Sequence, residues 1–199
     1  YLCGVWSGPG YIFKSSDKGV NWEYIDMSAY ATALVDIKFI DNLHGFVTGT
    51  DLYPGIGGVI LYTADGGMSW EKKINTYYHN ELVWRIQLLD SVNAFASIED
   101  ITGTNDARMM ISHDAGMTWE IKTLAFEYYN IEMVGFVNPD TGWVGGWFNG
   151  AFETFDGGES WSMNYYGNNL NRFYKVNDSL SFSSGETIYV YADTTSTID

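Results

Sequence analysis

Thr63-Ala-Asp-Gly-Gly-Met-Ser-Trp70 is one of four copies of an eight-residue pattern, Ser/Thr-x-Asp-x-Gly-x-x-Trp, that recurs along this chain. The other copies run from Ser15 to Trp22, from Ser112 to Trp119 and from Thr154 to Trp161, so that their aspartates are 48, 49 and 42 residues apart. A unit repeated at this interval is typical of the four-stranded blades of a β-propeller. The pattern therefore predicts an all-β fold of four-stranded antiparallel blades.

Each copy has the chemistry of a tight turn between two strands. The carboxylate can accept hydrogen bonds from the amides of its own turn, and the glycine suits a backbone with positive φ. The tryptophan begins the next strand and can bury a large indole between neighbouring sheets. We therefore expect structural roles for the residues of the four copies: Ser15, Asp17, Gly19, Trp22, Thr63, Asp65, Gly67, Trp70, Ser112, Asp114, Gly116, Trp119, Thr154, Asp156, Gly158 and Trp161.

The pattern is that of the Asp-box, or BNR repeat, which occurs in sialidases, in sortilin-like receptors, in xyloglucan-cleaving glycosidases and in the photosystem II stability/assembly factor-like family. The phrases between the boxes resemble the last family most, as in Val134-Gly-Phe-Val-Asn138 followed by Gly142-Trp-Val-Gly-Gly146. This resemblance covers nearly the whole chain and is weakest in the third blade. It implies a β-propeller and leaves the activity open.

The repeat also divides the chain. We expect full blades at about 33–75, 82–123 and 129–164, partial blades at 1–27 and 170–193, and a polar tail or linker at 194–199. The segment Leu2-Cys-Gly-Val-Trp6 resembles the second strand of a blade, which favours about five blades of a longer ring of roughly six to eight. The alternative is a small closed ring of five blades.

Charge and composition limit the partners. The net charge of −15, with only 10 Lys and Arg residues, argues against nucleic acid and against anionic membrane surfaces. No stretch of the sequence is apolar enough for membrane insertion, and the single cysteine, Cys3, cannot form an intramolecular disulfide. The family resemblance and the polar, tyrosine-rich composition predict a secreted or bacterial cell-surface protein whose export signal lies outside this window. The oligomeric state stays open.

The face opposite the box turns is the candidate binding face. Its expected blade-to-blade loops carry tyrosines, and a second-to-third-strand loop adds a tryptophan; together they are Tyr77, Tyr78, His79, Tyr128, Tyr129, Tyr165, Tyr166 and Trp147. Tyrosine offers a flat ring and a hydroxyl, which suit stacking on a sugar or gripping a peptide. We expect a glycan or protein ligand, although paired tyrosines that only pack on the neighbouring blade remain the alternative.

The other loops of that face are acidic and aromatic. They contain Trp6, Tyr11, Asp51, Tyr53, Glu99, Asp100, Asp106 and Asn149. Glu99-Asp100 lacks the alternating carboxylates of an EF-hand-type calcium loop, so we predict neither a metal site nor a cofactor.

Two kinds of enzyme share the repeat. A sialidase needs an arginine triad, but Arg85, Arg108 and Arg172 fall in different blades, and Trp84-Arg-Ile-Gln87 lacks the proline of the sialidase element. A glycoside hydrolase needs two carboxylates about 5 to 9.5 Å apart. Its candidate members are Glu81, Glu99, Asp100 and Glu132, with no indication from the sequence that any two meet.

The main prediction is a non-enzymatic binding module. The alternatives are an Asp-box glycoside hydrolase and a structural spacer in a larger surface protein. The basic surface patch through which photosystem assembly members bind a membrane-protein precursor is expected to be missing, because the chain has so few arginines.

Overall fold

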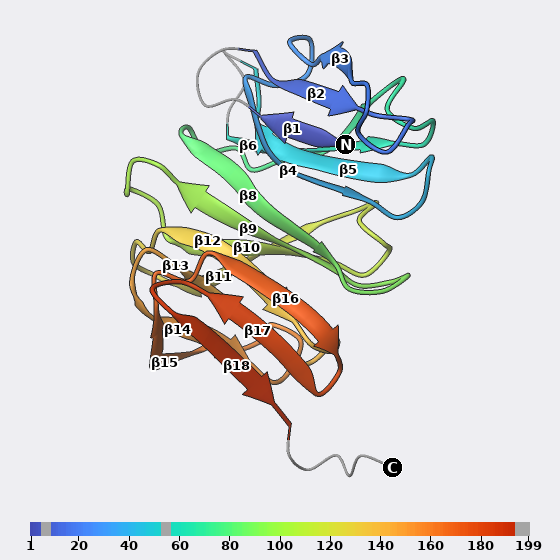
Figure 1. Cartoon of the computed structure of the whole chain (residues 1–199). Helices are drawn as coiled ribbons and strands as arrows, with labels where there is room; N and C mark the ends of the chain where they lie inside the picture. The colour runs from blue at the N-terminus through green and yellow to red at the C-terminus, as the bar shows by residue number, and fades with distance from the viewer. Residues whose placement is uncertain (5–8, 53–56, 194–199) are drawn as a thin grey trace, which may run out of the picture.

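The computed structural model describes residues 1–4, 9–52 and 57–193, and these residues form five antiparallel sheets in chain order (Figure 1). The first sheet contains β1 (Leu2–Gly4), β2 (Tyr11–Lys14) and β3 (Glu23–Asp26), and the last contains β16 (Arg172–Asn177), β17 (Leu180–Ser184) and β18 (Ile188–Ala192). The predicted all-β propeller fold of four-stranded blades is confirmed by the three sheets between them.

These three sheets have four strands each. Their strands are β4 (Ala33–Phe39), β5 (Gly45–Thr50), β6 (Gly58–Thr63) and β7 (Glu71–Asn75); β8 (Glu81–Leu88), β9 (Ala94–Asp100), β10 (Ala107–Ser112) and β11 (Glu120–Ala125); and β12 (Ile131–Phe136), β13 (Gly142–Gly146), β14 (Asn149–Thr154) and β15 (Ser162–Asn168). The sheets thus span 33–75, 81–125 and 131–168, beside expected blades at about 33–75, 82–123 and 129–164. The expected tail at 194–199 lies outside the described residues.

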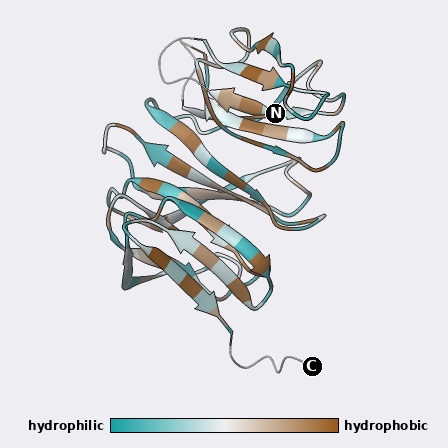
Figure 2. Ribbon diagram, viewed as in Figure 1, coloured by the Kyte–Doolittle hydropathy of each residue, from teal (hydrophilic) through white to brown (hydrophobic). Residues whose placement is uncertain are grey.

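The sheets stack in an arc around a central space. The first and the last sheet lie at opposite ends of this arc (Figure 1), and the inner strands β4, β8, β12 and β16 face the space. Apolar residues occur on the strands of all five sheets (Figure 2), and β5, β9, β12 and β13 are buried along nearly their whole length, as expected for sheets that are covered on both faces. No helix of the described residues has the length and apolar character to cross a membrane.

The box turns close as the residue types require. In the second box, the Thr63 hydroxyl donates to Asp65 Oδ1 at 2.8 Å and accepts from Gly67 N at 2.8 Å, while Ser69 N donates to the carboxylate at 2.9 Å. Gly67 has a φ of +86°, which a side chain would strain. The other three boxes repeat these bonds, so each aspartate carboxylate holds its turn closed by accepting hydrogen bonds from it.

The box tryptophans fill the spaces between sheets. Trp70 is 8% exposed and packs edge-on against Phe39, while Trp161 packs against Phe136 and the core shared by the third and fourth sheets. Each of these indoles lies against the preceding sheet. No described strand precedes the first sheet, and Trp22 is 45% exposed rather than part of the core.

Candidate functional site

Strand order fixes two edges of the arc. Because successive strands are antiparallel neighbours, the box turns between β6 and β7 share one edge with the turns between β4 and β5. The loops between sheets, and those between the second and third strands, share the opposite edge. Tyr77, Tyr128 and Trp147 lie in such loops, and their side chains are 74%, 40% and 68% exposed.

Within each tyrosine pair the two rings have different surroundings. The Arg108 guanidinium carbon lies 4.3 Å from the centroid of the Tyr78 ring. Tyr77 has a positive φ, and both Tyr77 and the nearby His79 are exposed. Tyr129 packs edge-on against Phe148 and Phe152, each at 4.9 Å. Its neighbour Tyr128 covers Gly103. In these two pairs the second tyrosine, Tyr78 or Tyr129, packs against other side chains, and the first, Tyr77 or Tyr128, is exposed.

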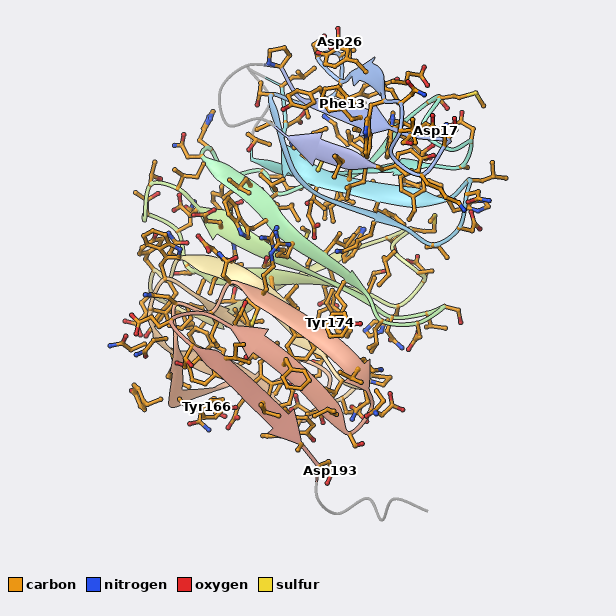
Figure 3. All side chains as sticks on the ribbon, viewed as in Figure 1. Phe13, Asp17, Asp26, Tyr166, Tyr174 and Asp193 are labelled. Carbon is orange, nitrogen blue, oxygen red and sulfur yellow. The ribbon has the colours of Figure 1, made fainter. Side chains whose placement is uncertain are left out.

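The third pair does not lie in a loop. Tyr165 and Tyr166 are inside β15, because the pairing of β14 with β15 continues past a bulge to Asn168. Tyr166 donates to Glu153 at 2.9 Å, and burial, with this bond, raises the pKa of Tyr166. Figure 3 shows Tyr166 at the far end of the molecule from Phe13 and Asp17. Tyr165 and Tyr166 therefore lie on a strand and not in the expected blade-to-blade loop. Trp6 and Tyr53 lie outside the described residues.

The inner strands bring four basic residues to one place. A hollow of about 280 Å³ lies between β4, β8, β12 and β16, and its lining includes Lys38, Arg85, Arg172 and Lys175. We call it the channel hollow. Four of the chain's 10 Lys and Arg residues thus share one small space in a protein of net charge −15. Basic side chains therefore gather between the inner strands although the chain has few of them.

Arg85 is a partly buried cation of the channel hollow, and its guanidinium lies 5.7 Å from the centroid of the Trp84 ring. Burial lowers its pKa, the charge of Arg172 lowers it further, and Asp36 and Glu132 oppose this effect. Within the described part of the chain, Arg85 Nε has no hydrogen-bond partner, and Nη1 reaches only the Trp84 carbonyl at 3.5 Å.

The carboxylate of the channel hollow is already engaged. Asp36 Oδ2 accepts from Ile86 N at 3.1 Å, and Lys38 Nζ lies 3.7 Å from the other oxygen. Lys175 pairs with Asp178 at 2.7 Å. The guanidinium of Arg172 forms no ion pair with any described carboxylate. Neither arginine forms an ion pair within 4.0 Å with a described carboxylate, although the charges of Asp36 and Glu132 act on Arg85.

The carboxylates of Glu99 and Glu132, whose relative position the sequence does not show, lie close enough to interact. Glu99 and Glu132 are each 5% exposed. Burial raises the pKa of Glu99 to about 7, with the charge of Glu132 as the second cause. Burial also raises the pKa of Glu132, although Asn171 donates a hydrogen bond to it. A sugar has no access between two such groups as they stand.

The other carboxylate candidates have structural partners. Glu81 forms an ion pair with Arg108, and burial raises its pKa. Asp100 accepts from the amides of Thr102, Thr104 and Asn105, which hold the following loop. Among the described residues no group of three or more His, Cys, Asp or Glu has the arrangement of a metal site.

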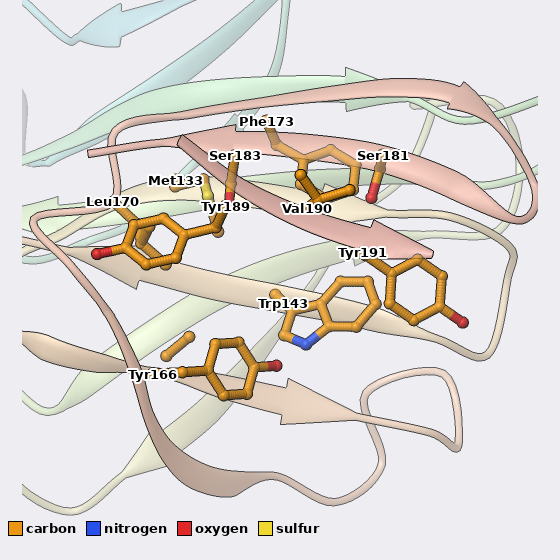
Figure 4. Close-up of a pocket in the computed structure, with 11 residues that line it drawn as sticks. Met133, Trp143, Tyr166, Leu170, Phe173, Ser181, Ser183, Tyr189, Val190 and Tyr191 are labelled. Atoms are coloured by element: carbon orange, nitrogen blue, oxygen red, sulfur yellow. The ribbon is translucent and has the colours of Figure 1, made fainter. Parts of the chain in front are cut away.

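A second cavity lies between the last two sheets (Figure 4). It measures about 400 Å³ and is lined by Met133, Trp143, Ala151, Tyr166, Leu170, Phe173, Ser181, Ser183, Tyr189, Val190 and Tyr191. We call it the interblade pocket. Most of its lining is aromatic or aliphatic, as in small-molecule and side-chain pockets.

Sequence reasoning missed both cavities. The sequence pattern does not bring together Lys38, Arg85, Arg172 and Lys175, because these residues belong to three different repeats. A usable signal was present: each lies in the strand that begins its blade, and the first strands of propeller blades line one channel.

Comparison with known proteins gives a family and a fold. Residues 13–125 match the family model described as "Photosynthesis system II assembly factor YCF48". The structure titled "YCF48 from Cyanidioschyzon merolae" aligns with a TM-score of 0.64 and 15% identity, over 96% of this chain and 63% of that chain. The structure titled "YCF48 bound to D1 peptide" aligns with a TM-score of 0.46 and 15% identity, over 93% of this chain and 72% of that chain. No curated protein matches.

The family match corrects one expectation. The family resemblance and the polar, tyrosine-rich composition predict a secreted or bacterial cell-surface protein. The family that matches is described by the assembly of a photosynthetic complex, which is not a cell-surface role, so this localisation is wrong. A tyrosine-rich, acidic composition does not predict in which compartment a protein is located.

Proposed function

The chain belongs to the family described as photosynthesis system II assembly factor YCF48, and we propose that it acts without catalysis, by binding an acidic segment of a protein partner in the channel hollow. The observation that carries this proposal is the convergence of Lys38, Arg85, Arg172 and Lys175 on one space of about 280 Å³. Glycan recognition has no support from the comparisons.

The chemistry of the two arginines suits a carboxylate. A guanidinium presents several N–H donors in a planar fork, and it binds a carboxylate through two parallel hydrogen bonds. Arg85 Nε has no acceptor among the described residues, and Arg172 lies near enough to lower the pKa of Arg85. A carboxylate between them would satisfy the open donors and relieve the repulsion between the two cations.

The rest of the protein supports selectivity for such a segment. A net charge of −15 repels acidic partners at long range, so an acidic segment gains affinity only where basic groups are gathered. The exposed Tyr77 and Trp147 lie on the loop edge of the arc and can hold the flanking residues of the segment.

The glycoside hydrolase alternative is weaker on geometry. Its best carboxylate pair, Glu99 and Glu132, is 95% buried on each side and therefore has no room for a glycosidic bond. A structural spacer would not explain why Arg85 Nε is buried without a hydrogen-bond acceptor among the described residues.

The test uses an array of peptides that are rich in Asp and Glu, each beside its Asn and Gln counterpart. Hits are measured by isothermal titration against the whole chain and against the double variant Arg85→Gln, Arg172→Gln. The matched control is Lys73→Gln, Lys122→Gln, which removes the same charge from outer strands. We expect the acidic peptides alone to bind, and at least a tenfold loss in the arginine variant only, about the size of one lost charged hydrogen bond. Equal losses in both variants would mean general charge attraction and would contradict the proposal.

A further inference from the structure

A third hollow lies on the loop edge of the arc. It comes from the connections between β13 and β14, between β15 and β16, and between β17 and β18, and Figure 1 shows the start of β16, the end of β17 and the start of β18 on the same side. It measures about 450 Å³ and is lined by Trp147, Asn169, Asn171, Ser184, Gly185 and Glu186. We call it the Trp147 pocket.

Backbone hydrogen bonds hold the walls of the Trp147 pocket together. Asn171 N donates to the Ser184 carbonyl at 2.8 Å, and Glu186 N donates to the Asn168 carbonyl at 3.1 Å. The turn between β17 and β18 approaches so closely that a Cβ at Gly185 would overlap the same Asn168 oxygen. The pocket is therefore formed before a ligand arrives, and its residues lose little freedom on binding.

The Trp147 side chain is held in place and still exposed. It forms a hydrogen bond with the carboxylate of Glu132, which also accepts from Asn171. The backbone of Trp147 is fixed as well, because its N–H donates to the Asn130 carbonyl at 3.0 Å. The residue is nevertheless 68% exposed. Much of an ordered indole ring is thus available to a ligand.

Glu186 gives the Trp147 pocket its charge. Its carboxylate accepts from Asn169 Nδ2 at 3.0 Å and from Asn168 Nδ2 at 3.4 Å, and it forms no ion pair with a described residue. No Lys or Arg of the described chain lines the pocket. An aromatic ring beside a carboxylate without a counter-charge suits a cationic side chain, which the ring attracts through its face and the carboxylate through its charge.

The Trp147 pocket adjoins the channel hollow at the start of β16. Asn171 lines the pocket, and the next residue, Arg172, lines the hollow. Arg172 is also paired in register with Ser184, at the pocket wall. An extended segment advances about 3.3 Å per residue, so side chains roughly two to five residues apart can occupy the two sites together.

We propose that the Trp147 pocket binds a Lys or Arg side chain of the same partner segment that places a carboxylate in the channel hollow. The cation lies against the Trp147 ring and pairs with Glu186. This assignment depends on the acidic-segment function proposed above, and it narrows the partner to a segment of mixed charge. The basic residue is attracted by a protein of net charge −15, which otherwise repels the acidic residue at long range.

The experiment uses the whole chain and short peptides in which one Glu is followed, at increasing spacing, by Lys or by norleucine. Norleucine keeps the length of the lysine side chain and removes its charge. Affinities are measured by isothermal titration at low and high salt. We expect the Lys peptide of the best spacing to bind about threefold or more tightly than its norleucine counterpart, and the difference to shrink at high salt.

Protein variants locate the contact. Trp147→Leu and Glu186→Gln should each remove most of the preference for Lys, and Glu186→Gln tests the site even if Trp147→Leu disturbs the fold through Glu132. The matched controls are Phe155→Leu, an aromatic residue 64% exposed in a box turn, and Glu23→Gln on β3. Both controls should keep the preference.

The outcomes separate the two sites. Equal affinity of Lys and norleucine peptides at every spacing, or a preference for Lys that survives in Glu186→Gln, would overturn the assignment of the Trp147 pocket. If Arg85→Gln, Arg172→Gln still weakened both kinds of peptide, the acidic-segment function would stand without it. If no peptide bound the unaltered protein, the acidic-segment function would fail and the cation site with it.

Discussion

Arg172 on β16 lies close enough to Arg85 on β8 for its charge to lower the pKa of Arg85, although the two residues belong to blades that are separated by a complete sheet. Like charges meet here because the inner strands of a propeller converge on one axis. This proximity implies that the two guanidinium groups repel each other when no anion lies between them.

Removing one of these cations should therefore stabilise the free protein. We expect Arg172→Gln to raise the free energy of unfolding by up to about 1 kcal/mol at low salt, and by less at high salt, where the repulsion is screened. Urea titrations at two ionic strengths measure this. Lys73→Gln, which loses its contact with Glu71 at 2.8 Å, should not be stabilising. A loss of stability in Arg172→Gln at low salt would contradict the prediction.

Glu99 should make stability fall as pH rises. Burial, with the charge of Glu132, raises its folded-state pKa to about 7 from an unfolded value near 4.5, so the native state binds more protons between these values. The contribution is fully present below about pH 4.5 and is lost as pH rises through about 7. Thermal unfolding is measured at several pH values across this range. Stability should depend less steeply on pH in Glu99→Gln than in the unaltered protein, while Glu127→Gln, at an exposed position, should show the unaltered dependence. An unchanged slope in Glu99→Gln would show that another group is responsible.

Asp65 should act in the opposite direction and at lower pH. Hydrogen bonds from the Ser69 side chain and backbone, then from Thr63, lower its pKa to about 2 from the usual 3.8. Its stabilising effect is present above about pH 4 and is lost as pH falls through about 2. Asp65→Asn should be less stable at neutral pH and less sensitive to acid, as followed by circular dichroism. Identical acid titrations of the two proteins would contradict this role for the box carboxylate.

The contact between the last two sheets can be tested at Gly135. A Cβ at this position would overlap the ring of Phe173 on β16. We expect Gly135→Ala to cost about 1–3 kcal/mol of stability by overpacking, measured by urea unfolding. Combined with Phe173→Leu, it should cost less than the sum of the two single changes, because the smaller side chain makes room. Strict additivity would mean that the two residues do not compete for this space.

The tyrosines show the limit of sequence reasoning at the surface. The pairs Tyr77-Tyr78 and Tyr128-Tyr129 lie near the expected loops, but Tyr165 and Tyr166 are inside a strand, because β15 pairs with β14 beyond a bulge. A glycine inside a strand can mark a bulge, and Gly150 and Gly167, with φ of +108° and +87°, lie at this one, but the register of the bulge depends on how the two strands pair.

The sequence by itself determined the fold. Residues within one turn, such as Thr63, Asp65 and Gly67, make their hydrogen bonds to each other, so their spacing along the chain predicts their geometry. Only the tertiary structure decided the candidate sites. Lys38, Arg85 and Arg172 are far apart in sequence, and Trp147 and Glu186 come from loops of different sheets. Their proximity follows from the way that whole blades stack around an axis: the repeat locates the first strand of each blade, but it does not show which side chains of different blades meet.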